Sequence, residues 1–146
     1  MKYFSINELT KSSTAIRQGI NNTPPQDAVV KMTALVDNIL DPLREAYGKP
    51  IVVDSGYRCA KLNKQVKGSA TSQHLTGEAA DIRSVSDNPK DNKEIFDLIV
   101  KLGLPFDQLI NEYDYNWVHV SFSKRNRRQK LKAVKQGGKT AYIAMK

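Results

Sequence analysis

Residues 72–81 read Ser-Gln-His-Leu-Thr-Gly-Glu-Ala-Ala-Asp, and residues 117–121 read Trp-Val-His-Val-Ser. The chain contains only two histidines, and each lies in one of these two segments. Two imidazoles and one carboxylate form a three-ligand set of the kind that holds catalytic zinc, with a fourth position left for water. The two segments therefore predict a metal site made of His74, Asp81 and His119.

The same segments predict how the three side chains come together. Gly77 and two small alanines between His74 and Asp81 favour a tight loop that leads into a strand over residues 78–82, with Asp81 on one side of it. Residues 117–122 alternate in the same way. The side expected to face the site carries Trp117, His119 and Ser121, and the side expected to face the core carries Val118, Val120 and Phe122.

The two segments also carry a family resemblance. The pattern S-x-H-x-x-G-x-A-x-D, followed by W-x-H and preceded by Ser-Gly-Tyr-Arg at residues 55–58, resembles the zinc D-alanyl-D-alanine carboxypeptidases and L-alanyl-D-glutamate endopeptidases. These enzymes, which include phage endolysins, have a hedgehog-like fold and cut peptidoglycan stem peptides. The resemblance extends from about residue 4 to about residue 122, and it implies that His74, Asp81 and His119 bind zinc and that Arg58 meets the substrate.

One position departs from the pattern of the family. Many members place an acidic general base three residues before the last histidine, and this chain has Asn116 there. Two carboxylates remain as candidates. Glu112 ends an expected strand that would pair with the strand of His119, whereas Asp114 lies in the expected turn, where aspartate commonly satisfies backbone groups. The sequence favours Glu112 as the base and leaves Asp114 as the alternative.

Other residues of the two motifs have a structural reading beside the functional one. Ser72 and Gln73 either contact the substrate or only shape the loop. Trp117 is expected to be a wall of the site and a core residue at once. Arg58 is expected to bind a substrate carboxylate or a developing oxyanion, and the alternative is an ordinary surface or ion-pair residue.

Length and local patterns predict one α+β domain over residues 1–146, an antiparallel sheet with flanking helices. Helices are expected after Ser5, after Pro25 with a break or kink at Pro42, and after Asn88. Strands are expected at residues 51–54, 78–82, 106–112 and 117–122, and the last two complete the sheet.

Positive charge is concentrated in a basic segment, residues 124–139. It contains eight Lys or Arg and no acid, which equals the formal net charge of +8. Such a run is typical of a solvated face or a mobile tail, and it would also attract polyanions. Anionic envelope polymers are the expected partners. No aromatic residue lies between Arg125 and Thr140 to stack on bases, so specific nucleic-acid binding is not expected.

The remaining features narrow the setting. No run approaches the roughly 20 apolar residues of a membrane span, and the amino terminus does not read as a signal peptide. A single cysteine, Cys59, excludes an internal disulfide. We therefore expect a monomeric zinc peptidase made in the cytoplasm that acts on the bacterial cell wall, and in this it resembles a phage or prophage lysis enzyme. The rival hypothesis is a zinc-containing wall-binding module with little or no activity, since Asn116 replaces the usual base.

Overall fold

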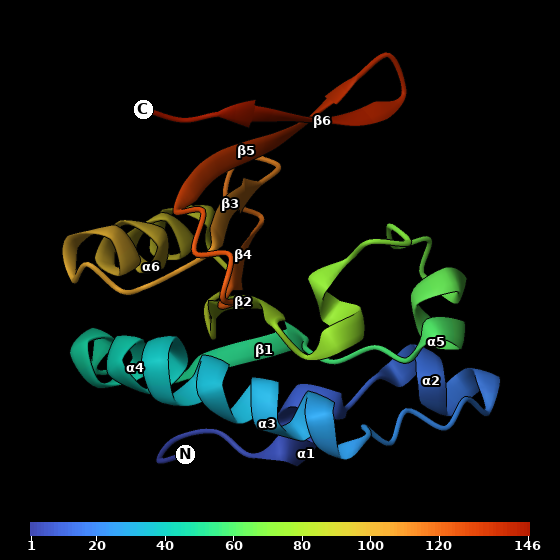
Figure 1. Ribbon diagram of the computed structural model, residues 1–146. Coiled ribbons are helices and arrows are strands. Elements are labelled where there is room, and N and C mark those ends of the chain that lie inside the picture. Colours follow the sequence, from blue (N-terminus) through green and yellow to red (C-terminus); the bar gives the residue numbers. More distant parts are fainter.

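The computed structural model describes all residues, 1–146, and contains a sheet of six strands flanked by helices (Figure 1). The order of the strands across the sheet is β1-β2-β4-β3-β5-β6. Neighbouring strands are antiparallel except for β3 and β5, which run parallel. The strands are β1 (Ile51–Ser55), β2 (Ala79–Ser84), β3 (Gln108–Glu112), β4 (Trp117–Ser121), β5 (Gln129–Gln136) and β6 (Lys139–Ala144). The predicted α+β class is confirmed, although the sheet is not purely antiparallel.

All the helices lie before β3 in the chain. They are α1 (Ile6–Thr10), α2 (Ser13–Gln18), α3 (Gln26–Leu35), the π-helical segment η1 (Val36–Leu40), α4 (Asp41–Tyr47), α5 (Ala60–Gln65), the 3-10 turn η2 (Gln73–Thr76) and α6 (Pro89–Lys101). The predicted cap of the first helix is present, because the Ser5 hydroxyl accepts a hydrogen bond from the Glu8 amide at 3.2 Å. Asn88 caps α6 in the same way, as its side chain accepts from the Lys90 amide at 2.9 Å. None of the helices combines the length and apolar character that a bilayer-spanning segment needs.

Pro42 does not break the long helix as the sequence suggests. Helices α3 and α4 are joined through η1, whose wider turns let the Asp41 amide donate to the Val36 carbonyl, five residues back. Proline has no amide hydrogen and clashes with an ordinary α-helical turn, and a π-helical turn just before it absorbs the irregularity. The core face of this helix is formed by Ala28, Met32, Leu35, Val36, Ile39, Leu40 and Leu43.

Helices α4 and α6 lie on one face of the sheet. Helix α6 packs on β2, β3 and β4 and touches α4, and the side chains between them form the apolar core. Ile82, Val118 and Val120 point into this core and are fully buried. Successive residues of a strand point to opposite faces, so Asp81, Trp117 and His119 lie on the face that these helices leave open. This arrangement confirms the predicted alternation.

Strands β5 and β6 were not expected. The basic segment is neither a tail nor only a solvated face, because half of it forms β5 beside β3. Ala133 of β5 is fully buried in the sheet. A two-residue turn of Gly137 and Gly138, with φ of 58° and 79°, returns the chain into β6. Positive φ at both positions is what a tight hairpin turn demands. In Figure 1 this β5–β6 hairpin lies at the end of the sheet farthest from α3 and α4.

Candidate metal centre and its cleft

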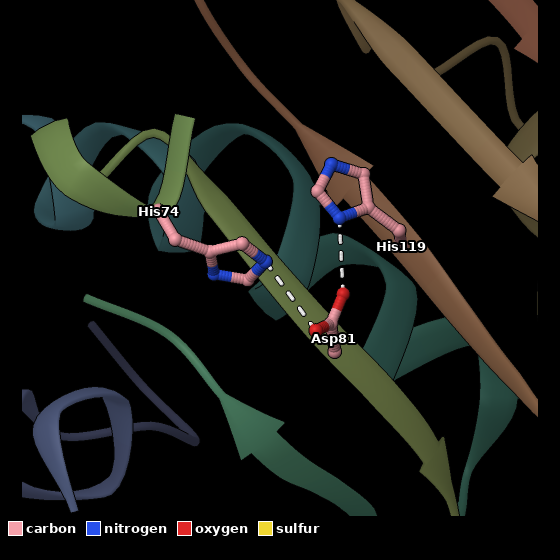
Figure 2. Close-up of side chains that lie close together, drawn as sticks. All are labelled: His74, Asp81 and His119. Carbon is pink, nitrogen blue, oxygen red and sulfur yellow. Dashed lines mark hydrogen bonds and ion pairs between the residues drawn. The ribbon is translucent and has the colours of Figure 1, made fainter. Parts of the chain in front are cut away.

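The three predicted donors meet on the open face of the sheet (Figure 2). Asp81 of β2 is paired directly with His119 of β4, so their side chains share one face. His119 Nδ1 lies 3.0 Å from Asp81 Oδ1. His74, on η2, brings its Nε2 to 3.3 Å from Asp81 Oδ2. The donor atoms of all three residues lie within 4.8 Å of one another.

The donor set fits a metal ion of the zinc type. Two ligand atoms bound at about 2.0–2.2 Å to a tetrahedral ion lie roughly 3.3–3.6 Å apart, close to the separations from Asp81 to the two histidines. The Nδ1 atom of buried His74 lies 2.6 Å from the Gly56 carbonyl oxygen. A carbonyl only accepts, so Nδ1 carries the proton and Nε2 is left free to bind a metal. The cluster can therefore hold a metal ion with little movement.

Two glycines explain why His74 is placed so closely. A Cβ atom at Gly56 would lie 2.2 Å from the Leu9 carbonyl oxygen, so only glycine lets this strand end pass α1. Gly77 ends η2 with φ of 81°, and a Cβ there would lie 2.7 Å from the Ala28 carbonyl oxygen. The close approach at Gly77 packs the loop of His74 against α3. The close approach at Gly56 packs the residue that contacts His74 Nδ1 against α1. The glycine of the S-x-H-x-x-G motif is thus required by backbone packing.

The surroundings of Asp81 keep it ionised. Burial by itself would raise the pKa of this carboxyl, but the adjacent imidazoles of His74 and His119, when protonated, hold it well below its usual range. An ionised carboxylate accepts only, and it is the form that binds a cation. Asp81 therefore suits a role as a metal ligand better than one in proton transfer.

Glu112 and Asp114 have different environments. Glu112, the last residue of β3, lies beside Trp117 of β4 and is only 7% exposed. Burial raises the pKa of Glu112 to about 7, with His119 opposing and Asp81 adding to the rise. Asp114 is exposed in the turn between β3 and β4, at a φ of 60°. Asn116 is exposed as well. The favoured candidate lines the cleft, and the alternative does not.

All the residues predicted for the site line one cleft of about 820 Å³. These are Arg58, Ser72, Gln73, His74, Asp81, Glu112, Trp117 and His119. Arg58 is half-buried, and its Nε has no hydrogen-bond partner. Ser72 both shapes the loop and faces the cleft, because its hydroxyl accepts from the His74 amide at 3.1 Å and lies 3.4 Å from Arg58 Nη2. Trp117 is half-buried, with its ring 5.5 Å from that of Tyr113.

The sequence did not single out Asp107, which precedes β3. Asp107 is fully buried, and its carboxylate accepts hydrogen bonds from Gln73 Nε2 at 2.8 Å and from Ser123 Oγ at 3.0 Å. Arg127 of the basic segment donates to the same carboxylate through its amide, Nε and Nη2, at 2.7–3.0 Å. Asp107 thus joins the loop before His74 to the start of β5. No local pattern marks this role, since it depends on contacts far apart in the sequence.

Two further groups of residues line the cleft and were not predicted. One group precedes β4 in the chain: Val66, Lys67, Gly68, Ser69, Thr71, Gln108, Ile110 and Tyr113. The other group comes from beyond β4. Leu131 of β5 and Thr140 and Tyr142 of β6 form its far side, and Arg125 and Arg127 lie at its edge. Alternating apolar residues around Gly-Gly could have indicated this hairpin. The positive charges of the same segment favour solvation and mask that alternation.

Two imidazoles and a carboxylate that share an open cleft with a protonatable glutamate define the site of a metal-dependent hydrolase. The family model of peptidase M15 matches residues 2–121, and the chain belongs to this family. Membership makes the protein a metallopeptidase. A search of curated proteins found no match to the chain. The family match ends with β4, so β5 and β6 lie outside it.

Proposed function

We propose that the protein is a zinc peptidase that hydrolyses peptide bonds of bacterial peptidoglycan stem peptides, at a bond to or from a D-amino acid. The observation that carries this proposal is that three metal donors and Glu112 line one open cleft in a member of the peptidase M15 family. His74 Nε2, an Asp81 carboxylate oxygen and His119 Nδ1 would hold the ion. When bound in such a site, zinc supplies a Lewis acid for the scissile carbonyl and lowers the pKa of water to about 7.

Glu112 is the residue that we assign to proton transfer. The only other acid that lines the cleft is Asp81, which is committed as a donor. A carboxyl whose pKa lies near 7 exchanges its proton readily at neutral pH. Glu112 would take the proton of the attacking water and return it to the leaving nitrogen. Glu112 is only 7% exposed and lines the cleft, so its carboxyl would meet a bound peptide rather than bulk solvent.

Arg58 and Trp117 are assigned to the substrate. Arg58 lines the cleft and carries a planar, permanently charged fork, whose Nε is buried without a hydrogen-bond partner. Such a fork suits the carboxylate of a stem peptide or the oxyanion that develops on the scissile carbonyl. Trp117 lines the cleft beside Glu112 and gives it an apolar side. Ser72 and Gln73 complete the border on the side of His74.

The second candidate function is a wall-binding module that retains the metal without turnover. Asn116 at the usual place of the base favours it. The location of Glu112 weakens this argument, because a buried carboxylate in the cleft can replace the missing base. We therefore rank the peptidase first. A role as a lysis enzyme of phage or prophage origin, acting at the wall as a monomer, stays a prediction.

Exposed positive charge supports an additional contact with the envelope. Six basic side chains of the basic segment are exposed: Lys124, Arg125, Arg128, Lys132, Lys135 and Lys139. They would attract anionic envelope polymers over about 10 Å at 0.1 M salt. This attraction would raise the concentration of the enzyme at the wall without selecting the bond that is cut.

Digestion of purified peptidoglycan tests the proposed function. The zinc-loaded protein should release peptide fragments whose masses identify the bond, and a chelator should abolish the release. A His119→Ala variant that still folds is the matched control. Zinc binding without release of any fragment would reject the peptidase and favour the binding module.

A further inference from the structure

The β5–β6 hairpin lies outside the family match and yet borders the cleft. The strand register shows how. Trp117 of β4 is paired with Glu112 of β3, Glu112 with Ala133 of β5, and Ala133 with Tyr142 of β6. Directly paired residues point to the same face of a sheet. These four residues therefore form one row across four strands. In this row Tyr142 lies two strands away from Glu112, the residue that we propose as the base.

The hairpin is held firmly in this position. The Tyr113 hydroxyl, at the end of the β3–β4 hairpin, lies 2.5 Å from the Thr140 hydroxyl of β6. At the start of the segment, Arg127 is bound to buried Asp107. Five residue pairs join β5 to β3 between these two contacts. The far side of the cleft is thus a fixed wall.

Tyr142 presents its side chain to a ligand. It is 58% exposed and lines the cleft. Ala133 lies between Tyr142 and Glu112 in this row, and its side chain ends at Cβ. Burial of the hydroxyl raises the pKa of Tyr142, and Glu112 and Tyr113 add to the rise, so the phenol stays protonated and can donate a hydrogen bond.

The distance across the sheet defines which part of a substrate this side chain meets. Neighbouring strands lie about 4.8 Å apart, so β6 is about 10 Å from β3 and about 14 Å from β4. An extended peptide rises about 3.3 Å per residue. A peptide that crosses the strands from His119 on β4 would pass Tyr142 about four residues from the scissile bond.

We propose that the β5–β6 hairpin forms an outer peptide-binding subsite, in which Tyr142 packs against the substrate and donates a hydrogen bond to one of its backbone carbonyl oxygens. This inference rests on the proposed function. It makes the hairpin a determinant of substrate length, because a short peptide would fill the metal end of the cleft without reaching β6. The substrate class is therefore an extended stem peptide rather than a dipeptide.

The test compares Tyr142→Phe and Tyr142→Ala with the parent protein on a series of stem peptides shortened one residue at a time from either end. For the longest peptide we expect kcat/KM to fall about 3- to 10-fold in Tyr142→Phe, as one hydrogen bond is lost, and further in Tyr142→Ala. The ratio of kcat/KM between the parent protein and each variant should return to one when truncation removes the residue that reaches β6. Ile143→Ala is the matched control, since Ile143 neighbours Tyr142 on the opposite face of β6.

Binding provides a second readout that does not depend on turnover. Trp117 is the only tryptophan and lines the cleft, so its fluorescence should report peptide binding to the zinc-loaded Glu112→Gln protein. Adding Tyr142→Ala should weaken binding of the long peptide and leave that of the truncated one unchanged. The subsite is overturned if the ratio between the parent protein and the Tyr142 variants is the same for all peptide lengths. It is also overturned if that ratio equals one for the longest peptide. A parent protein that neither binds nor cuts any peptide of the series rejects the proposed function, and the subsite with it.

Discussion

Replacing Asp107 by asparagine tests how strongly the basic segment is joined to the sheet. The carboxylate is fully buried and accepts five hydrogen bonds, three of them from Arg127. Asparagine keeps one acceptor oxygen and turns the other into a donor, so at least two of the five donors lose their partner. Removing one partner of a buried ion pair costs about 3–5 kcal/mol. Arg127 is 26% exposed, and water would recover part of this cost, so we expect a loss of about 3 kcal/mol in the free energy of unfolding.

The pKa of Asp107 fixes the pH range of the effect. Burial alone would raise it, but hydrogen bonds from Arg127, and then from Gln73 and Ser123, hold it well below its usual range. A carboxyl with a lowered pKa in the folded state contributes its stability above the unfolded-state pKa of about 3.9 and loses it as the pH falls toward the folded-state pKa. The difference between parent and Asp107→Asn should be complete at pH 7 and shrink below about pH 4.

Urea unfolding followed by circular dichroism at several pH values measures this difference. Asp97→Asn is the matched control, because Asp97 pairs with Lys93 at 2.7 Å on the exposed side of α6, where we expect no measurable change. A loss below about 1 kcal/mol at pH 7 would refute the argument that Asp107 anchors the segment. A difference that stays constant down to pH 3 would refute the assigned direction of the pKa.

Three further predictions concern the site. Alanine in place of any one donor, as in His119→Ala, should abolish stoichiometric zinc binding, and full zinc occupancy in the variant would disprove the ligand set. Glu112→Gln should keep zinc and lower turnover about 10²- to 10⁴-fold, while Asp114→Asn should change little; the reverse result in steady-state kinetics would move the base to the turn. Arg58→Lys should keep fold and zinc but lower turnover, because an ammonium cannot replace the planar fork, and unchanged kinetics of Arg58→Ala would remove it from the site.

A further prediction concerns the exposed basic side chains of the basic segment. Their neutralisation should weaken association with whole cell walls at low salt and spare hydrolysis of a small peptide. Equal losses on both substrates would mean that these side chains build the cleft instead. Arg125 and Arg127 are left out of this set, because Arg125 lies at the edge of the cleft and Arg127 anchors β5 to Asp107.

The sequence could point to the three candidate metal donors because their signal is local. His74, Asp81 and His119 lie in motifs whose alternation also fixes which face they occupy, and the structure brings them together on that face. Glu112 could be ranked above Asp114 for the same reason, since a strand end and a turn differ in their short-range pattern.

The features that escaped prediction depend on distant contacts or on competing signals. Nothing near Asp107 indicates that Gln73 and Arg127 will bind it. The π-helical segment before Pro42 arises because packing of the flanking helices outweighs the tendency of proline to end a helix. The β5–β6 hairpin was hidden because strong charge suggested solvation, although positive side chains on a strand are compatible with pairing when the alternate positions are small or apolar.

Parallel pairing of β5 with β3 also decides where an expressed fragment of the chain can end. β5 covers one edge of β3, so only β1 and β6 have an unpaired edge in the intact sheet. A fragment that stops at Ser121 would keep every metal donor and match the family over its whole length, yet it would expose the amide and carbonyl groups of β3. Unprotected strand edges pair with other chains and lead to aggregation. The end of the family match is therefore a poor boundary for an expressed fragment.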